Sequence, residues 1–283
     1  MVSKPQAEIT DMQFAQNSLQ DYVDCPRRFQ LRHLLKVAWP AIRAEPIAEM
    51  ERRARLGQRF HRMVQQYFLG VSIERLERGI DDEDLRRWWH NFLSAPPRDL
   101  PTVIRRVEVS LSAPLDSCRL TARYDLLAAD AGKRQVIVDW KTHRPKDPQR
   151  LREKLQSVVY PYVLVEAGAA FNGGQPVRPE QVAMVYWFAD LPNDPLQLDY
   201  DATRHAANHD RLMALVREIE TYCAEGMETW PLTDFSHNCK FCTYRSLCNR
   251  GSAAGDLDDL DEELEIEELS DIDLGQVAEI VFQ

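Results

Sequence analysis

Residues 119–141 read RLTARYDLLAADAGKRQVIVDWK, and this stretch organises the rest of the chain. Two runs of strand-forming residues flank a polar turn at residues 130–133, a pattern typical of a β-hairpin. Side chains two residues apart on a strand share one face of the sheet. We therefore expect Asp139 and Lys141 to point to the same side and Trp140 to the other.

The hairpin would also bring a second carboxylate to this place. Asp125 lies on the first run, and pairing of the two strands would set it close to Asp139, with Lys141 beside them. Two carboxylates in one pocket repel each other, and a hard divalent cation such as Mg²⁺ relieves that repulsion. A water held by the ion can become a nucleophile, and a neighbouring lysine would stabilise charge on a phosphate. Charged residues also protect exposed strand edges, so these residues alone leave both interpretations open.

The composition of the 283-residue chain fits one large domain, or a core domain with an appendage. A hydrophobic content of 44% supports a sizeable buried core. The chain has no long uncharged apolar run of the kind that spans a membrane, and its N-terminus lacks the apolar core of a secretory signal. We therefore expect a cytoplasmic protein whose six cysteines lie in a reducing compartment, where they bind metal more often than they form disulfides.

The formal net charge of −10 is unevenly distributed. Residues 251–283 contain no Lys or Arg and twelve of the 45 acidic residues, so residues 1–250 carry 35 basic and 33 acidic side chains. The near-neutral body permits DNA binding. The acidic tail has two open interpretations. Its like charges favour disorder, whereas its leucine and isoleucine residues at near-helical spacing favour an amphipathic segment that folds on a protein partner or on the body.

Outside the hairpin, helical and strand patterns alternate along the chain. His61 lies in a predicted helix, beside an apolar stripe and four residues after Gly57, and Glu108 lies on a predicted strand. In a later helix Gln156 and Tyr160 are four residues apart and share a face. The elements follow the order of helices over residues 17–36, 45–69 and 84–93, a strand over 103–111, the hairpin, a helix over 148–168, a strand over 181–189 and a helix over 202–227. This order predicts an α/β fold in which helices flank a sheet, and the chain has no Walker-type phosphate loop.

Three cysteines near the end of the chain have metal-ligand spacing. Cys239, Cys242 and Cys248 form C-x₂-C-x₅-C, and a short loop of this kind holds three thiolates together. A tetrahedral zinc site or a four-iron cluster needs one more ligand. The spacing does not choose between zinc and iron–sulfur, and the candidates for the fourth ligand are Cys25, Cys118, Cys223 and, for zinc, His237.

Taken together, these motifs resemble those of RecB-type nucleases of the PD-(D/E)XK superfamily. The resemblance is to the iron–sulfur branch, which includes AddB-type nuclease domains and the CRISPR-associated exonucleases of spacer acquisition. It runs from about Ser18 to Cys248. The family's motifs match, in order, a helical G-x-x-x-H at Gly57 and His61, a strand aspartate at Asp125, a D/E-x-K strand at Asp139, Trp140 and Lys141, and a Q-x-x-x-Y at Gln156 and Tyr160. The chain departs from the pattern in having Arg123 and Tyr124, not glycine, before Asp125, and in having Pro161 directly after the motif tyrosine.

The resemblance implies a restriction-endonuclease-like domain over residues 1–250, with a mixed central sheet flanked by helices, followed by the acidic tail over residues 251–283. It implies a Mg²⁺- or Mn²⁺-dependent DNA nuclease, an exonuclease acting on DNA ends or single strands in repair, recombination or CRISPR adaptation. The implied roles are metal ligation by His61, Asp125, Asp139 and the Trp140 carbonyl; water positioning and charge stabilisation by Lys141; DNA contact or support of the site by Gln156 and Tyr160; and a second-metal or supporting role for Glu108.

The resemblance also implies a 4Fe–4S cluster, with zinc as the alternative metal. Its fourth ligand would be Cys25, in the segment CPRRF, so that the cluster forms a clasp between the N- and C-terminal segments. Two other classes of function are weighed against the nuclease. One is a non-catalytic, DNA-end-binding iron–sulfur scaffold subunit of a larger nuclease complex, which the full set of catalytic motifs disfavours. The other is an electron-transfer or sensor protein, which a single cluster tied across most of the chain disfavours.

Overall fold

The computed structural model describes residues 13–39, 45–145, 147–226, 228–240 and 242–251, with only the helical backbone for residues 45–51. The chain forms two compact units, each made of two stretches of sequence. The sheet unit comprises residues 1–16 and 59–226, and the cysteine unit comprises residues 17–58 and 227–283. Residues 252–283, which hold most of the predicted acidic tail, lie outside the described residues.

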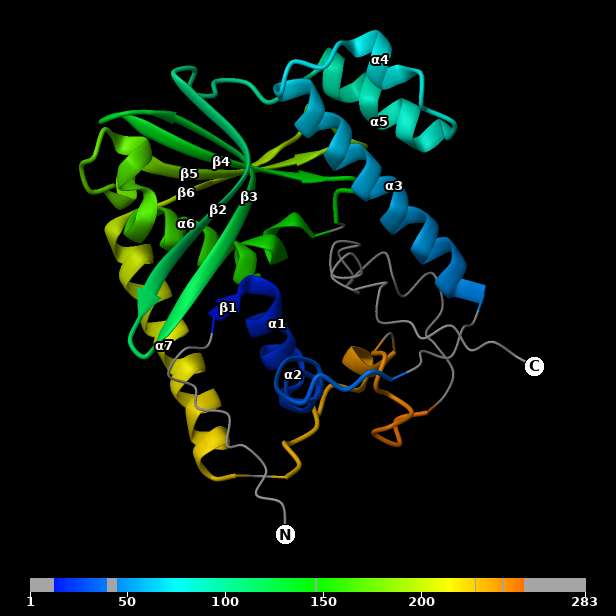
Figure 1. The fold of residues 1–283 in the computed structure, drawn as a ribbon, viewed down its shortest axis with the longest axis vertical. Coiled ribbons are helices and arrows are strands. Elements are labelled where there is room, and N and C mark those ends of the chain that lie inside the picture. The colour runs from blue at the N-terminus through cyan, green and yellow to red at the C-terminus, as the bar shows by residue number, and fades with distance from the viewer. Residues whose placement is uncertain (1–12, 40–44, 146, 227, 241, 252–283) are drawn as a thin grey trace. The chain divides into compact units, whose positions relative to one another are not determined.

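The sheet unit contains a six-stranded sheet and most of the helices (Figure 1). Its strands are β1 (Gln13–Ala15), β2 (Ile104–Leu115), β3 (Cys118–Asp130), β4 (Arg134–Lys141), β5 (Val182–Phe188) and β6 (Leu196–Asp199). Its helices are residues 59–68 of α3 (Glu45–Phe68), α4 (Ile73–Glu77), α5 (Glu83–Ser94), α6 (Leu155–Ala167) and α7 (Ala202–Ala224), with 3₁₀ turns η3 (Pro148–Arg152), η4 (Gly168–Asn172) and η5 (Pro179–Gln181). The cysteine unit contains α1 (Gln16–Asp24) from its second residue, α2 (Pro26–Phe29), the π-helical turn η2 (Gln30–Leu34), residues 45–58 of α3 and η6 (Ser236–Cys239).

The predicted α/β architecture is confirmed, and the sheet is mixed, as the resemblance implied. The hairpin forms between β3 and β4, and the apolar run at 181–189 becomes β5, which is buried along its whole length. The patterns did not reveal β1, β6 and α4, because elements of three to five residues are too short to show a period. The helix predicted over residues 148–168 divides into η3 and α6. Every helix in the described part of the chain falls short of what crossing a membrane would require.

The topology of the sheet leaves an opening beside β3. The antiparallel strand β2 pairs along one edge of β3, while β1 and β4 share the other edge. The parallel strand β1 pairs with residues 119–121, and the antiparallel strand β4 pairs with residues 126–130. Between these stretches, residues 122–125 of β3 have no strand neighbour on this edge within the described residues. The sheet then continues from β4 to the parallel β5 and the antiparallel β6.

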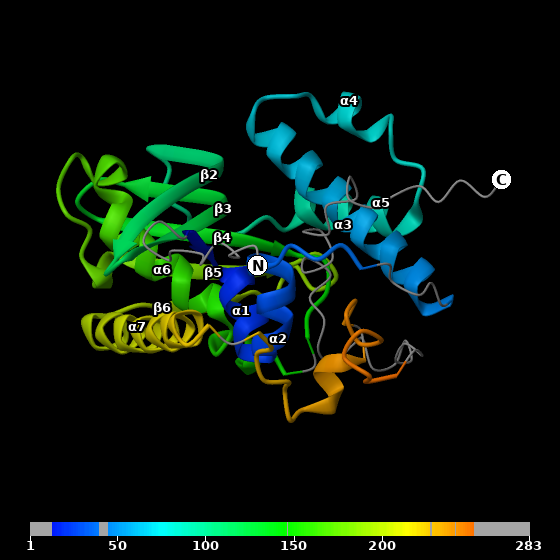
Figure 2. The ribbon, with the colours of Figure 1, turned by 60° about the horizontal axis from the view of Figure 1, so that its bottom comes forward.

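One face of the sheet is covered by α6, and α7 packs against α6 in turn (Figure 2). Ten consecutive residues of α6, 155–164, are buried, since the helix lies between the sheet and α7. A polar side chain on this helix must therefore find its partners inside the protein. Pro161 lies within α6, and the helix continues through it.

The opposite face of the sheet carries an aromatic cluster. Trp140 and Trp187 are register partners on β4 and β5, so their side chains point to the same face. Phe60 of α3 stacks on Trp187, with ring centroids 6.1 Å apart and an interplanar angle of 11°. Phe68, two turns later, stacks on Trp140 at 6.3 Å, and Phe92 of α5 meets both tryptophans edge-on. These contacts fix both the position and the rotation of residues 59–68 of α3.

We expect Phe60→Ala to destabilise the sheet unit by about 3–5 kcal/mol, because Phe60 is fully buried and its removal leaves a cavity against Trp187. Urea unfolding followed by tryptophan fluorescence measures this change. Leu69→Ala is the matched control, since Leu69 directly follows α3 and is 67% exposed. Equal unfolding midpoints for the two variants would contradict the proposed anchoring of α3.

Candidate active site

The two predicted carboxylates meet where the β3–β4 ladder stops. The register pairs Leu126 with Val138, so Asp125 and Asp139 are the next residues on the two strands and face each other. The ladder does not continue past this point. Instead, the Trp140 backbone N–H donates to Asp125 Oδ2 at 2.9 Å. The side chain of Asp125 thus takes the place of a backbone acceptor at the opening beside β3.

Asp139 belongs to a buried network with Lys141 and Gln156. Lys141 Nζ lies 3.0 Å from Asp139 Oδ2 and donates to Gln156 Oε1 at 3.1 Å. Gln156 Nε2 donates to Asp139 Oδ1 at 2.6 Å. An amide is suited to this place because it can accept from an ammonium and donate to a carboxylate at once. The network satisfies two buried charges that would otherwise be costly to remove from water.

A second layer of contacts holds Gln156 in place. Tyr186 is the register partner of Asp139 and points to the same face, where its hydroxyl lies 3.4 Å from Gln156 Oε1. The Tyr186 hydroxyl also lies 2.7 Å from Ser157 Oγ, and Ser157 Oγ donates to the Leu151 carbonyl. These bonds join α6 to β5 and the η3 turn, and thereby hold Gln156 against the end of β4.

His61 reaches Asp125 from α3. Its Nδ1 lies 3.5 Å from Asp125 Oδ2, and the two side chains are 18% and 17% exposed. Burial raises the pKa of Asp125, but the charge and hydrogen bond of His61, the Trp140 N–H and the charge of Lys141 lower it by more, so the net pKa falls below its usual range. Asp125 is therefore ionised at neutral pH. This pair forms the part of the site that solvent reaches.

Tyr160, the last residue of the predicted Q-x-x-x-Y, lies next to the strand that carries Asp125. It is 7% exposed, and its ring meets that of Tyr124 edge-on at 5.3 Å. The Tyr124 hydroxyl donates to the Tyr160 backbone carbonyl at 3.1 Å. Because Tyr124 directly precedes Asp125, these contacts tie α6 to β3 at the site.

Glu108 lies on β2, which pairs with the edge of β3 opposite to the opening. Its neighbours Val107 and Val109 pair with Leu126 and Tyr124, which places Glu108 opposite Asp125, but these two residues are not paired in the ladder. Its φ of 54° is in the left-handed region, which is strained for a residue with a side chain. Its carboxylate accepts from Arg123 Nε at 2.6 Å, so it is engaged by a basic residue that is itself 68% exposed.

The site has the donor types that a hard divalent cation prefers. Within the described residues, no three His, Cys, Asp or Glu side chains already stand in an arrangement that would hold a metal ion. The donor chemistry at the opening nevertheless fits Mg²⁺ or Mn²⁺, which bind carboxylate oxygens and accept an imidazole nitrogen. Asp125 and His61 supply these groups on the side open to solvent, with Asp139 at the facing position.

The cysteine unit is made of residues 17–58 and 227–283, and hydrogen bonds join these two segments around Cys25. The helix predicted over residues 17–36 is divided, because α1 ends at Asp24 and α2 begins at Pro26, which leaves Cys25 at the junction. Next to it, the Arg27 backbone N–H donates to the Pro231 carbonyl at 3.1 Å. On its other side, Asn238 Nδ2 donates to the Asp24 carbonyl at 2.8 Å. These bonds connect the chain around Cys25 to the segment that leads into Cys239.

Cys239, Cys242 and Cys248 form the cysteine triplet, and the charge of Cys25 acts on the thiol of each. Burial is the largest influence on all three thiols and raises the pKa of each. The Cys25 thiol raises it further, whereas positive charge from Arg27, Arg28 and Arg250 acts against this rise.

The two other cysteines that the spacing left as candidate ligands belong to the sheet unit. Cys118 lies on β3 and its thiol donates to the Leu115 carbonyl at 3.1 Å, while Cys223 lies on α7. Burial, with Glu220 and Asp116, raises the pKa of Cys118 to about 11.

Comparison with solved structures finds similar chains at low sequence identity. A protein from Eubacterium rectale, described as "Putative exonuclease", has 10% sequence identity and a TM-score of 0.51, with 91% of this chain and 92% of that chain covered. The protein SSO0001 has 13% identity and a TM-score of 0.41, with 85% and 86% covered. No curated protein matches the chain.

The family comparison agrees with the geometry of the site. The model of the PD-(D/E)XK nuclease superfamily matches residues 13–249. This range includes the β3–β4 hairpin, its facing aspartates, the lysine at the end of β4 and the helix that carries Gln156. The arrangement and the match lead to the same conclusion: the chain belongs to the PD-(D/E)XK nuclease superfamily.

Proposed function

We propose that this nuclease is a Mg²⁺- or Mn²⁺-dependent DNA exonuclease that acts on DNA ends or single strands. The observation that carries the proposal is the buried network of Asp139, Lys141 and Gln156 beside the ionised Asp125. The shared fold of the Eubacterium rectale protein described as an exonuclease supports the preference for ends. The activity serves DNA repair and recombination or CRISPR adaptation.

The metal would be held by His61, Asp125, Asp139 and the backbone carbonyl of Trp140. When bound, it would supply positive charge that polarises the phosphate and makes a bound water easier to deprotonate. The net reaction adds water across a P–O bond and yields a phosphate monoester and a free hydroxyl. The low pKa of Asp125 keeps this ligand ionised, and its hydrogen bond from Trp140 keeps it aimed at the opening.

Lys141 positions the attacking water and stabilises charge on the phosphate. It is 6% exposed, so its charge acts where water screens it little. Gln156 keeps the ammonium directed toward Asp139, and Tyr186 limits the movement of Gln156. In this proposal Gln156 and Tyr160 are positioning residues, and Glu108 serves a second metal or supports the site.

We expect Lys141→Ala and Asp139→Ala each to lower DNA cleavage by at least about 100-fold, because each removes a group that acts on the charge of the reacting phosphate. Degradation of end-labelled single-stranded DNA with Mg²⁺ or Mn²⁺ measures this loss. Lys133→Ala is the matched control, since Lys133 is an exposed lysine at the other end of the same hairpin. Urea unfolding of each variant checks the fold, and undiminished cleavage by a folded variant would place the site elsewhere.

We expect Gln156→Leu to lower kcat by about tenfold or more with little change in KM, because it removes a bond to each of two charged groups without touching the substrate. Steady-state cleavage of a short labelled oligonucleotide separates the two constants. Gln175→Leu is the control, since Gln175 is exposed on a loop. A rise in KM with kcat unchanged would argue that Gln156 contacts DNA instead.

The proposal includes a 4Fe–4S cluster bound by Cys25, Cys239, Cys242 and Cys248, with zinc as the alternative. The mutual influence of these thiols and the hydrogen bonds around Cys25 support a common site. The positive charge of Arg27, Arg28 and Arg250 suits the negative charge of a four-thiolate centre. The cluster would be structural and would tie the two segments of the cysteine unit together.

We expect protein purified without oxygen to contain about four iron and four sulfide per chain, as a four-cysteine cubane requires. Cys25→Ala should lose the cluster and lower stability, because ligation by Cys25 closes a long loop of chain. Cys223→Ala is the control, since Cys223 lies on α7 in the sheet unit. Zinc without sulfide would overturn the iron–sulfur assignment, and an intact cluster in Cys25→Ala would exclude Cys25 as the ligand.

The cytoplasmic location stays a prediction. The same holds for a protein partner of the acidic tail, since residues 252–283 lie outside the described residues.

A further inference from the structure

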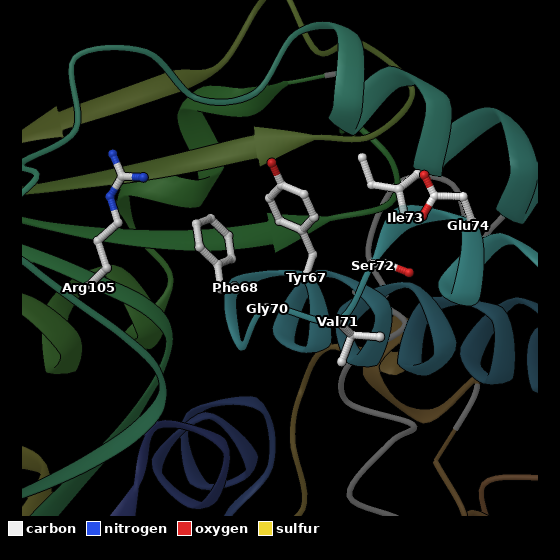
Figure 3. Close-up of a pocket in the computed structure, with 8 residues that line it drawn as sticks. All are labelled: Tyr67, Phe68, Gly70, Val71, Ser72, Ile73, Glu74 and Arg105. Atoms are coloured by element: carbon white, nitrogen blue, oxygen red, sulfur yellow. The ribbon is translucent and has the colours of Figure 1, made fainter.

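A pocket of about 620 Å³ lies in the sheet unit at the end of α3 (Figure 3). It is formed by the last residues of α3, the turn into α4 and one side chain from β2. A second, more enclosed pocket of about 210 Å³ shares Tyr67, Phe68 and Arg105 with the first. The residues that complete the second pocket are apolar, namely Phe92, Leu93, Pro96, Pro97 and Leu100.

A glycine turn builds the wall of the larger pocket. Gly70 has a φ of 87°, and its N–H donates to the Tyr67 carbonyl while the Val71 N–H donates to the Gln66 carbonyl. This pair of bonds is the Schellman ending of a helix, which needs a residue in the left-handed region. The turn leads the chain from α3 into the segment whose Val71, Ser72 and Ile73 line the pocket. This wall of the pocket is therefore set by the hydrogen bonds that end α3.

Tyr67 presents a rigid aromatic surface to this pocket. It is 37% exposed, although its ring packs against those of Phe68, Trp89 and Phe92 at 5.5–6.0 Å. A ring that is held by its neighbours and partly open to solvent loses little freedom when a flat group stacks on it.

The two charged residues that line the pocket, Arg105 and Glu74, have opposite charges. Figure 3 shows Tyr67 and Phe68 between Arg105 on one side and Glu74 on the other. Arg105 is exposed, and its Nε donates to the Pro101 carbonyl at 3.2 Å. A phosphate would be attracted by Arg105 and repelled by Glu74. A neutral ring with both donors and acceptors suits the pair, because guanidinium groups donate to base acceptors and carboxylates accept from base amino groups.

The pocket is connected to the active site through shared side chains. Phe68 stacks on Trp140, which lies between Asp139 and Lys141 on β4. Tyr67 follows His61 by six residues on α3, a distance of about 9 Å along the helix axis. Nucleotides in a DNA strand are spaced by roughly 3.4 Å or more, so a strand with its phosphate at the site would bring a nearby base to the pocket.

We propose that this aromatic pocket binds an unpaired nucleobase of the substrate strand, within a few nucleotides of the phosphate that is cleaved. The proposal rests on the proposed nuclease function for the choice of ligand. Tyr67 stacks on the base, and Arg105 and Glu74 contact opposite edges of it. The pocket thereby favours single strands or frayed ends over an intact duplex, whose bases are stacked on one another.

The test compares two oligonucleotides that differ only in their bases. One is fluorescein-labelled oligothymidylate, and the other is a chain of abasic nucleotides with the same number of phosphates. Binding of the full-length protein is measured by anisotropy, at fixed salt and with a chelator present so that no cleavage occurs. Because no turnover is needed, a failed nuclease assay and a failed pocket proposal give separate results.

We expect Tyr67→Ala to weaken binding of oligothymidylate by about tenfold, the loss of one base–aromatic stack, and to leave binding of the abasic chain unchanged. Tyr67→Phe should restore binding, and Arg105→Gln should also act only on the chain with bases. Leu69→Ala is the matched control, because Leu69 is an exposed apolar residue next to the pocket that does not line it.

Equal weakening of both oligonucleotides by Tyr67→Ala would overturn the proposal, since it would mean that the residue supports the fold or the phosphate path. Unchanged binding of both by Tyr67→Ala and Arg105→Gln would also overturn it and would assign the pocket to another ligand, such as an apolar peptide segment. An effect of Leu69→Ala as large as that of Tyr67→Ala would overturn it in the same way.

Discussion

The opening along one edge of β3 is the constraint on which the site depends. A strand that pairs with β1 at one end and β4 at the other leaves a short stretch between them without a strand neighbour. Backbone groups at such a place need other partners, and the Asp125 carboxylate supplies one by accepting from the Trp140 N–H. The same carboxylate can be approached from α3, which is why His61 meets Asp125 although α3 and α6 pack on opposite faces of the sheet.

The buried ion pair of Lys141 and Asp139 has a cost in stability. Taking Lys141 and Asp139 out of water costs free energy that their mutual attraction does not always return. Gln156 offsets that cost by bonding to both charges, and Tyr186 and Ser157 hold the amide in place. Two apolar side chains of similar size in place of Lys141 and Asp139 would need no hydrogen bonds from Gln156. In the proposed function, the value of this arrangement lies in its chemistry.

The aromatic cluster links this chemistry to the surface. Stacked pairs such as Phe60 with Trp187 resist rotation of the helix, so the side chains on either side of them keep fixed directions. His61 lies next to Phe60, and Tyr67 lies next to Phe68, which stacks on Trp140. One packed cluster thus fixes the positions of two side chains, the candidate metal ligand His61 and the exposed ring of Tyr67. A nuclease gains from this because substrate and catalytic groups must be held to a fraction of an ångström.

Local pattern in the sequence was enough to predict the hairpin, the common face of Asp139 and Lys141, and the long helix that carries His61. Each of these follows from a period of two or 3.6 residues, which depends only on neighbours along the chain. Only the tertiary structure decided that β1, three residues long, pairs with β3 and so creates the opening beside Asp125. It likewise decided that the Tyr67 ring would stay 37% exposed while Trp89 and Phe92, against which that ring packs, were buried. These outcomes depend on contacts between distant parts of the chain, which no local period records.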